Sequence, residues 1–268
     1  EKLKKGEFDE GLLEAAINNY KLMQMHRIDD NDGRADMFVS SFIDGVDWKD
    51  EVASLDRMSK VTKQQIVDFA NKYFGDNYAL IYKKQGKDPN EKKIDKPKIT
   101  PIVMNRDSSS MFLKEIQASK VAPIEPVFLD YSKDLTQLKA KSDIPVLYKQ
   151  NTTNDIFQLI YLFDMGNNND KALGTAAQYL EYLGTADMTP EEVKSEFYRL
   201  ACSFFVSPGS KRTYVVLSGL NENMPAAMAL FEKLLANAQV NKEAYANMAN
   251  DILKSRKDAK LNQMQNFS

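Results

Sequence analysis

Hydrophobic positions recur at helical spacing through the first third of the chain. One stripe spans residues 8–23, and a second helix is expected over residues 33–43. A third helix begins after Thr62, where Gln65 completes the sequence pattern of a capping box. The β-favouring run at residues 78–82 then predicts a strand. The pattern therefore indicates a mainly helical region that closes with a strand.

A connector is expected over residues 86–132, where charged residues and prolines replace the periodic pattern. Its prolines are Pro89, Pro97, Pro101, Pro123 and Pro126. Proline removes a backbone donor and restricts the residue before it, so long regular elements are disfavoured here. A short helix is predicted within the connector at residues 109–118.

Strand and helix patterns follow one another through residues 133–268. The predicted elements are strands over 144–150 and 155–165, helices over 170–183 and 189–204, a strand over 214–220, and helices over 224–235 and from 242 onward. The two leading strands are expected to form a hairpin through residues 151–154. Hairpin-joined strands with helices collected on one side predict an α+β fold with an antiparallel sheet.

Composition narrows the classes of function. The formal net charge is −2 over 268 residues, so the chain is not marked for nucleic acid. No run approaches the ~20 apolar residues that a membrane helix requires. The single cysteine, Cys202, excludes both an intramolecular disulfide and a cysteine-rich zinc site. It is expected to be a buried thiol on the helix that begins at Thr189.

A zinc hydrolase needs three protein ligands and an open position for water, with ligands on a helix spaced one turn apart. The predicted helix that ends in Gly184-Thr185 resembles the motif helix of the M16 family of zinc metallopeptidases, the insulinase and pitrilysin group. That family carries H-x-x-E-H on such a helix, followed by Gly-Thr. The resemblance puts Gln178 at the first histidine, Glu181 at the general base and Tyr182 at the second histidine.

The resemblance covers most of the chain outside the connector. Its further motifs are residues 6–9, 47–48, 61–66, 73–74, 189–192, 213–220 and 221–223. It implies that the third ligand of the family, a glutamate on a later helix, corresponds to Ser255. Family members hold four homologous α+β domains, only one of which carries the metal. Both ends of the chain look like the interior of a domain, so a fragment of a longer protein is expected.

The resemblance also implies a division of the chain into three parts. Residues 1–85 correspond to the C-terminal part of one M16-like domain, residues 86–132 to the inter-domain connector, and residues 133–268 to an M16-like domain without metal ligands. The zinc-binding domain of the parent protein is expected upstream.

The residue types of the chain disfavour a metal site whatever its family. Glutamine is a poor zinc ligand and neutral tyrosine is seldom one. With one histidine and one cysteine, only carboxylates remain to complete a site. The acidic turn at residues 29–33 lacks the acids of a calcium loop, which would stand at Ile28 and Val39, and is interpreted as a turn between helices. No catalytic residue, cofactor or metal is therefore predicted in this chain.

Three hypotheses of function follow. The first is a non-catalytic segment of a zinc-dependent metalloendopeptidase, which helps to enclose a peptide substrate and to hold the domains together. The second is part of an inactive M16-like partner subunit or scaffold. The third is an unrelated α+β binding module. The partners expected under the first are the peptide, which adds to strand 214–220 or 156–163, and other M16-like domains of the same chain or of a partner subunit. A periplasmic or cell-envelope location fits the family and the low cysteine content.

Overall fold

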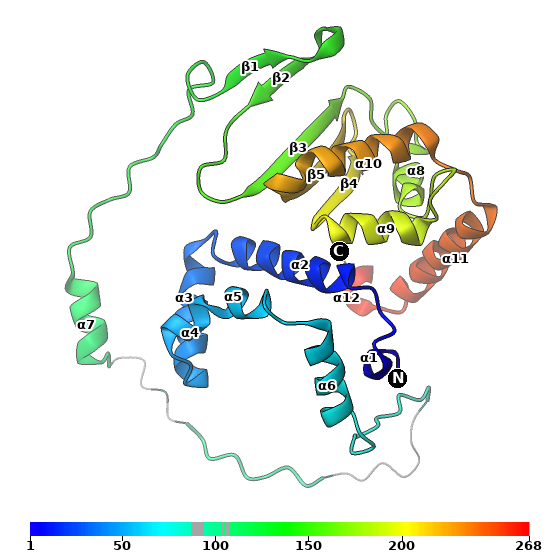
Figure 1. Ribbon diagram of the computed structural model, residues 1–268. Coiled ribbons are helices and arrows are strands. Elements are labelled where there is room, and N and C mark those ends of the chain that lie inside the picture. Colours follow the sequence, from blue (N-terminus) through cyan, green and yellow to red (C-terminus); the bar gives the residue numbers. More distant parts are fainter. Residues whose placement is uncertain (87–93, 103, 105–107, 268) are drawn as a thin grey trace. The chain divides into compact units, whose positions relative to one another are not determined.

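The computed structural model describes residues 1–86, 94–102, 104 and 108–267 (Figure 1). The chain forms two compact units. One combines Glu1–Gly75 with Gln150–Ser268, and the other is Asp76–Lys149. Helices and antiparallel sheets make up the structure, which confirms the predicted α+β class. The three-part division into residues 1–85, 86–132 and 133–268 stays a prediction.

Residues 1–75 are helical, as the sequence predicts. The helices are α1 Lys2–Lys5, α2 Gly11–Arg27, α3 Asn31–Asp44, α4 Trp48–Val52, α5 Ser54–Met58 and α6 Lys63–Tyr73. The acidic turn is a helix cap, because Asp30 Oδ1 accepts a hydrogen bond from Gly33 N at 2.6 Å. The capping box of α6 is complete, with Thr62 and Gln65 each bonding the backbone of the other.

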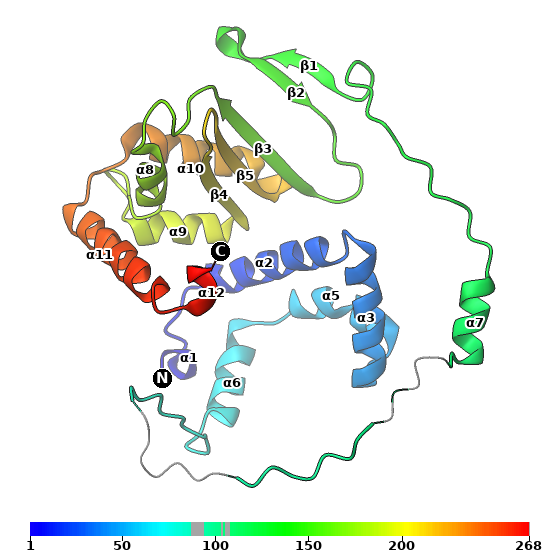
Figure 2. The ribbon, with the colours of Figure 1, turned by 180° about the vertical axis from the view of Figure 1, so that it is seen from behind.

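A three-stranded antiparallel sheet forms the centre of residues 150–268 (Figure 2). Its strands are β3 Ile156–Phe163, β4 Cys202–Pro208 and β5 Thr213–Leu220, in the order β3-β5-β4. The helices around it are α8 Leu173–Leu180, α9 Pro190–Arg199, α10 Met224–Asn237, α11 Lys242–Ala259 and α12 Gln263–Asn266, with the 3₁₀ turn η2 Asn221–Asn223. The predicted capping box at Thr189 and Glu192 is present at the start of α9.

The hydrophobic core lies between one face of this sheet and the helices α9 and α10. Its buried members are Phe157, Val193, Phe197, Cys202, Val215, Leu217, Ala227, Phe231 and Leu234. On the other face Ile160, Leu162, Phe205 and Tyr214 stay 42–51% exposed. Val216 and Leu220 on this face of β5 are nevertheless buried. The clustered core lies on the side of the sheet where α9 and α10 pack, as predicted for helices packed on one side of an antiparallel sheet.

The segment around Cys202 corrects the sequence prediction. Residues 189–204 were expected to form one helix, but α9 ends at Arg199 and Cys202 opens the strand β4. The reversal occurs at Ala201, whose φ of 45° breaks the helix. From Cys202 onward inward and outward side chains alternate, which is the period of a strand rather than of a helix. Cys202 is buried as predicted, and burial raises the pKa of its thiol to about 11.

Two predicted strand arrangements are also wrong. Strand 155–165 was expected to pair with 144–150, but β3 pairs along its full length with β5, from Ile156↔Leu220 to Phe163↔Thr213. This register places Phe157 in the core. The predicted pairing with 144–150 was chosen only because the two strands are neighbours in the sequence, and it does not account for this burial. No strand forms at residues 78–82, where Ile81 and Tyr82 are exposed. A strand requires a pairing partner, and local β-propensity does not supply one.

The second unit contains one helix and one hairpin. Helix α7, Met111–Ala118, confirms the helix predicted at 109–118 and is capped by Ser110 Oγ, which accepts from Leu113 N at 3.1 Å. Strands β1 Thr136–Lys139 and β2 Pro145–Tyr148 pair antiparallel across the 3₁₀ turn η1 Lys141–Asp143. Among the described residues of the whole chain, no helix combines the length and apolar character needed to cross a membrane.

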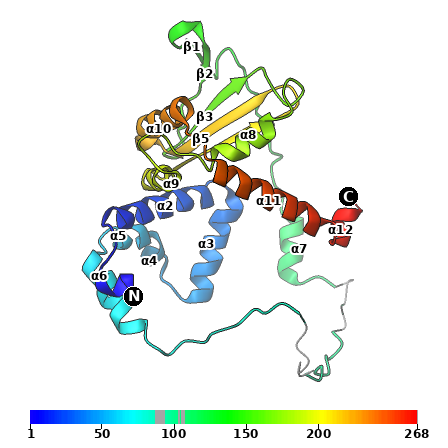
Figure 3. The same ribbon diagram turned by 90° about the vertical axis from the view of Figure 1, so that its right-hand side faces the viewer.

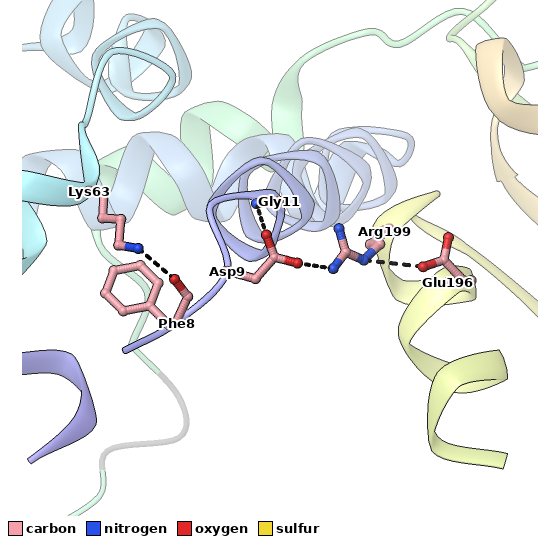
Figure 4. Close-up of polar contacts among 6 residues, drawn as sticks. All are labelled: Phe8, Asp9, Gly11, Lys63, Glu196 and Arg199. Carbon is pink, nitrogen blue, oxygen red and sulfur yellow. Dashed lines mark hydrogen bonds and ion pairs between the residues drawn. The ribbon is translucent and has the colours of Figure 1, made fainter. Parts of the chain in front are cut away.

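Polar contacts join α2 to α9 within the first unit, where the two helices lie side by side (Figure 1, Figure 3). Asp9, just before α2, accepts a hydrogen bond from the Arg199 guanidinium and from Gly11 N (Figure 4). Glu196 Oε1 lies 3.3 Å from the other side of the same guanidinium. Asn19 of α2 donates to a backbone carbonyl near the end of α9, Tyr198 O, at 2.6 Å. The link therefore fixes the start of α2 against the last turn of α9.

Acid titration should reveal the Asp9–Arg199 pair. The hydrogen bond from Arg199, followed by that from Gly11 N, lowers the pKa of Asp9 below 3.8. A carboxylate with a lowered folded-state pKa stabilises the fold above its unfolded pKa, and this contribution disappears as the pH falls through the folded value. Asp9→Asn should thus lower the stability near neutral pH and have progressively less effect below pH 3.8. Urea unfolding at several pH values measures this, with Asp251→Asn as the control. Parallel pH profiles for wild type and Asp9→Asn would contradict it.

Two glycine substitutions should have opposite effects on stability. Gly219 of β5 has φ +156°, and a Cβ there would collide with Ala201 O and Cys202 Sγ. Gly174 lies inside α8, and its Cβ would meet only Asn167 Oδ1, at an ordinary 3.8 Å. Gly219→Ala should therefore cost about 1–3 kcal/mol, whereas Gly174→Ala should stabilise by about 0.5–1 kcal/mol. Denaturant unfolding compares the two, and a Gly219→Ala variant as stable as the wild type would refute the packing described for β5.

Candidate functional site

Helix α8 carries the segment in which the sequence places the degenerate ligand motif. Asp170 Oδ1 accepts from Ala172 N at 2.8 Å in the turn before the helix, and α8 then runs from Leu173 to Leu180. The prediction of a helix over 170–183 is therefore too long at both ends. Past Leu180 the chain tightens, since Tyr182 N donates to Tyr179 O at 3.0 Å and Leu183 N to Leu180 O at 3.2 Å.

The shortened helix separates the motif positions. Gln178 lies on α8, Glu181 is the residue that caps its end, and Tyr182 follows outside it. Tyr182 is exposed, and Lys194 Nζ stands 5.4 Å from its ring centroid. Ser255 lies on α11 and is exposed. In this geometry Gln178 and Tyr182 do not share one continuous helical face, which is what a pair of helix-borne metal ligands needs.

A pocket of about 680 Å³ lies between α8 and α11, and Gln178 is one of its lining residues. Its lining residues are Asn167, Lys171, Gly174, Thr175, Gln178, Tyr245, Met248, Ala249, Ile252, Leu253 and Arg256. The members from 171 to 178 recur at intervals of three and four, as do those from 245 to 256. Each helix therefore contributes one face. Ser255, aligned with the third ligand, is not among the residues that line the pocket, whereas Ile252 one turn earlier is.

Tyr179 holds the two helices together at one end of this pocket. Its hydroxyl donates to Asn241 O at 2.6 Å and accepts from Asn241 N at 2.8 Å, just before α11 begins. The Tyr179 ring also meets the Tyr245 ring edge-on, with centroids 5.4 Å apart. The hydroxyl of Tyr179 is thus occupied in fastening α8 to the start of α11.

The charges around the pocket are positive. Lys171 and Arg256 line it, and its lining includes no Asp, Glu, His or Cys. Neither cation takes part in an ion pair with any residue that the structure describes. Asn167 Nδ2 donates to Pro208 O at 2.9 Å, and its Oδ1 is buried without a partner in the described chain. Asn167 N also donates to Gly209 O at 2.8 Å, so backbone and side-chain hydrogen bonds together hold the Asn167 loop against residues 208–209.

The described part of the chain contains no group of three His, Cys, Asp or Glu side chains arranged to hold a metal ion. The pocket also contains no carboxylate, imidazole or thiol that could take a proton from water. What it presents is two cations, the side-chain amide of Gln178, the hydroxyl of Thr175 and an apolar wall from α11. These groups can bind a ligand through charge, hydrogen bonds and apolar contact.

Sequence reasoning found Gln178 but missed Lys171 and Arg256. The sequence contains part of the information needed to find them, because the spacing of residues 171–178 and 245–256 indicates the two helical faces that carry them. Nothing in the sequence states that these faces oppose each other across a pocket.

Among known proteins, the chain is similar to solved structures of peptidases. No protein-family model matches the chain. No curated protein matches it. The solved structures that resemble it include the following three. The first is a peptidase M16 inactive domain from Pseudomonas fluorescens, at 18% identity and a TM-score of 0.42, covering 48% of this chain and 32% of that one.

The second is the periplasmic protease PqqL from Escherichia coli, at 11% identity and a TM-score of 0.43, covering 96% of this chain and 33% of that one. The third is a mutant of the ferredoxin protease FusC in complex with Arabidopsis ferredoxin, at 10% identity and a TM-score of 0.38, covering 97% and 33%. The chain thus spans about a third of the length of the structures it matches.

Removing the Tyr179 hydroxyl should loosen the pocket. Tyr179→Phe deletes both hydrogen bonds to Asn241 and keeps the ring contact, so it should lower the free energy of unfolding by about 1 kcal/mol. Tyr245→Phe is the matched control, because the structure gives the Tyr245 hydroxyl no hydrogen bond to a described residue. Urea unfolding of both variants measures the difference. Equal losses in the two would show that the Tyr179 hydroxyl does not join the helices.

Proposed function

We propose that this chain is a non-catalytic segment of a zinc-dependent metallopeptidase of the M16 type. In this role it helps to enclose a peptide substrate and to hold the domains of the parent protein together. The observation that carries the proposal is the replacement of the ligand residues within an otherwise ordered set of family motifs. Gln178 and Tyr182 stand where two histidines would bind zinc, and Ser255 stands where a glutamate would complete the site.

The composition of the pocket supports the non-catalytic role. Zinc hydrolysis needs a coordinated water and a carboxylate that accepts its proton. Glu181, at the position of that carboxylate, is exposed beyond the end of α8 and does not line the pocket. The residues that do line it bring positive charge, which opposes the binding of a metal cation.

The sheet supports a role in contacting extended peptide. The sequence offered two strands for peptide addition, 214–220 and 156–163. Strand β5, Thr213–Leu220, is paired on both sides and has no free edge. Strand β3, Ile156–Phe163, is paired on one side only among the described residues and contains no charged side chain. An uncharged edge strand of eight residues is a ready template for another strand, so β3 is the edge at which we place peptide addition.

Under this proposal, other parts of the parent protein supply the peptidase activity. A zinc ion bound by an intact H-x-x-E-H motif would be supplied by an upstream domain. Other M16-like domains, on the same chain or on a partner subunit, would form the rest of the enclosure. The apolar sheet face at Ile160, Leu162, Phe205 and Tyr214 offers a surface for such an assembly.

Metal analysis of the purified 268-residue chain tests the non-catalytic role. After incubation with zinc and extensive dialysis, elemental analysis should find less than about a tenth of an equivalent, because the ligand set is missing. The chain should also cleave no peptide. A full equivalent of zinc that is lost in Glu181→Ala would overturn the proposal and make this region the catalytic candidate. Asp251→Ala, which alters another exposed carboxylate, is the control.

The same measurement on the complete parent protein separates the two M16-like hypotheses. One bound zinc and a chelator-sensitive peptidase activity would support an inert segment of an active enzyme. Absence of both would support the alternative, an inactive partner subunit or scaffold.

A further inference from the structure

The pocket between α8 and α11 has features that enclosing a substrate does not require. Its two walls differ in chemistry. The face of α11 presents Met248, Ile252 and Leu253, whereas the α8 side presents Thr175 and Gln178. A cation stands on each side, Lys171 before α8 and Arg256 near the end of α11.

We propose that this pocket binds the carboxyl terminus of a peptide whose last residue is apolar. The guanidinium of Arg256 can hold a carboxylate through two parallel hydrogen bonds, and the Lys171 ammonium adds a second positive charge. The apolar wall of α11 receives the terminal side chain. The Gln178 amide, which both donates and accepts, matches the last peptide group of the ligand.

Charge complementarity selects this occupant. No acid lines the pocket, and neither Lys171 nor Arg256 is neutralised by a described residue. A ligand without a negative charge would leave both cations unpaired, and a ligand without apolar surface would leave the α11 wall exposed. A fatty acid also combines a carboxylate with apolar surface, but it has no amide group to use Gln178 or Thr175.

The dimensions of the pocket fit a terminal residue and its neighbour. Its volume of about 680 Å³ falls within the range of pockets that take small ligands. Gly174 contributes to this space, because it faces the pocket without a side chain and a Cβ there would meet only Asn167 Oδ1 at 3.8 Å. A larger side chain at position 174 would therefore occupy the space meant for the ligand.

The inference does not rest on the parent being a peptidase. Zinc content and cleavage concern the ligand motif and the upstream domain, whereas binding of a peptide carboxylate concerns Lys171 and Arg256. Either the proposed function or the proposed carboxylate binding can therefore be refuted by experiment while the other stands.

Binding of acetyl-Leu-Leu as the free acid to the 268-residue chain tests the proposal. Calorimetry or NMR titration should give a Kd on the order of 1 mM, as expected for a small ligand held by exposed charges. The carboxamide of the same peptide should bind about tenfold more weakly, because it lacks the charge that Arg256 and Lys171 recognise. Raising the salt from 0.05 to 0.5 M should weaken the acid and leave the amide nearly unchanged.

Five variants localise the binding. Arg256→Gln and Lys171→Gln should each weaken the acid about fivefold, whereas Lys257→Gln, next to Arg256 but outside the pocket, should not. Gly174→Leu should abolish binding while Gly174→Ala keeps it. Circular dichroism verifies that each variant is folded.

Three results would overturn the proposal. One is equal affinity for acid and amide, or no binding of the acid at up to about 20 mM, well above the millimolar range expected. Another is an unchanged Kd in both Arg256→Gln and Lys171→Gln. The third is decanoate binding as tightly as the peptide acid, which would assign the pocket to lipid carboxylates instead.

Discussion

Burial of one face of β5 is the constraint on which the rest of the first unit depends. This strand lies between β3 and β4, so its backbone is satisfied on both sides, and Val215 and Leu217 on its core face are buried. The face that carries Leu217 must be covered, and α9 and α10 cover it. The placement of α9 then determines where α2 can dock, because α2 contacts the layer through Asp9, Asn19 and the last turn of α9.

The helical segment of residues 1–75 is held by different forces. Its apolar side chains are largely unburied, with Phe42 87% and Ile43 73% exposed. Little hydrophobic stabilisation is therefore available to α3 from the described chain. The caps at Asp30 and Thr62 define where α3 and α6 begin, and the polar link from Asp9 to Arg199 ties the start of α2 to the sheet layer. Hydrogen bonds and caps of this kind each contribute about 1 kcal/mol, so this segment is marginal by itself.

Local signals in the sequence were reliable where the physical cause was local. Both capping boxes, at Thr62 and Thr189, depend on residues three positions apart, and both are present. The errors came from interactions across the chain. Strand β4 was hidden because Phe197, Ala201 and Phe204 also fit a helical stripe, and only pairing with β5 decides between the two periods. The partner of β3 was wrong for the same reason, since the nearest strand in sequence is not the one that completes the core.

For the candidate site, too, the sequence predicts what has a local cause and misses what depends on interactions across the chain. That Gln178 and Tyr182 cannot replace histidines as zinc ligands follows from residue chemistry alone, without any fold. Lys171 and Arg256 are 85 positions apart in the chain (256 minus 171), and they border one pocket only because the fold brings α8 and α11 together. These two facts reinforce each other. A divalent metal ion between α8 and α11 would be repelled by both cations, whereas a carboxylate would be attracted by both. The positive charge of Lys171 and Arg256 therefore favours a carboxylate over a zinc ion in this pocket.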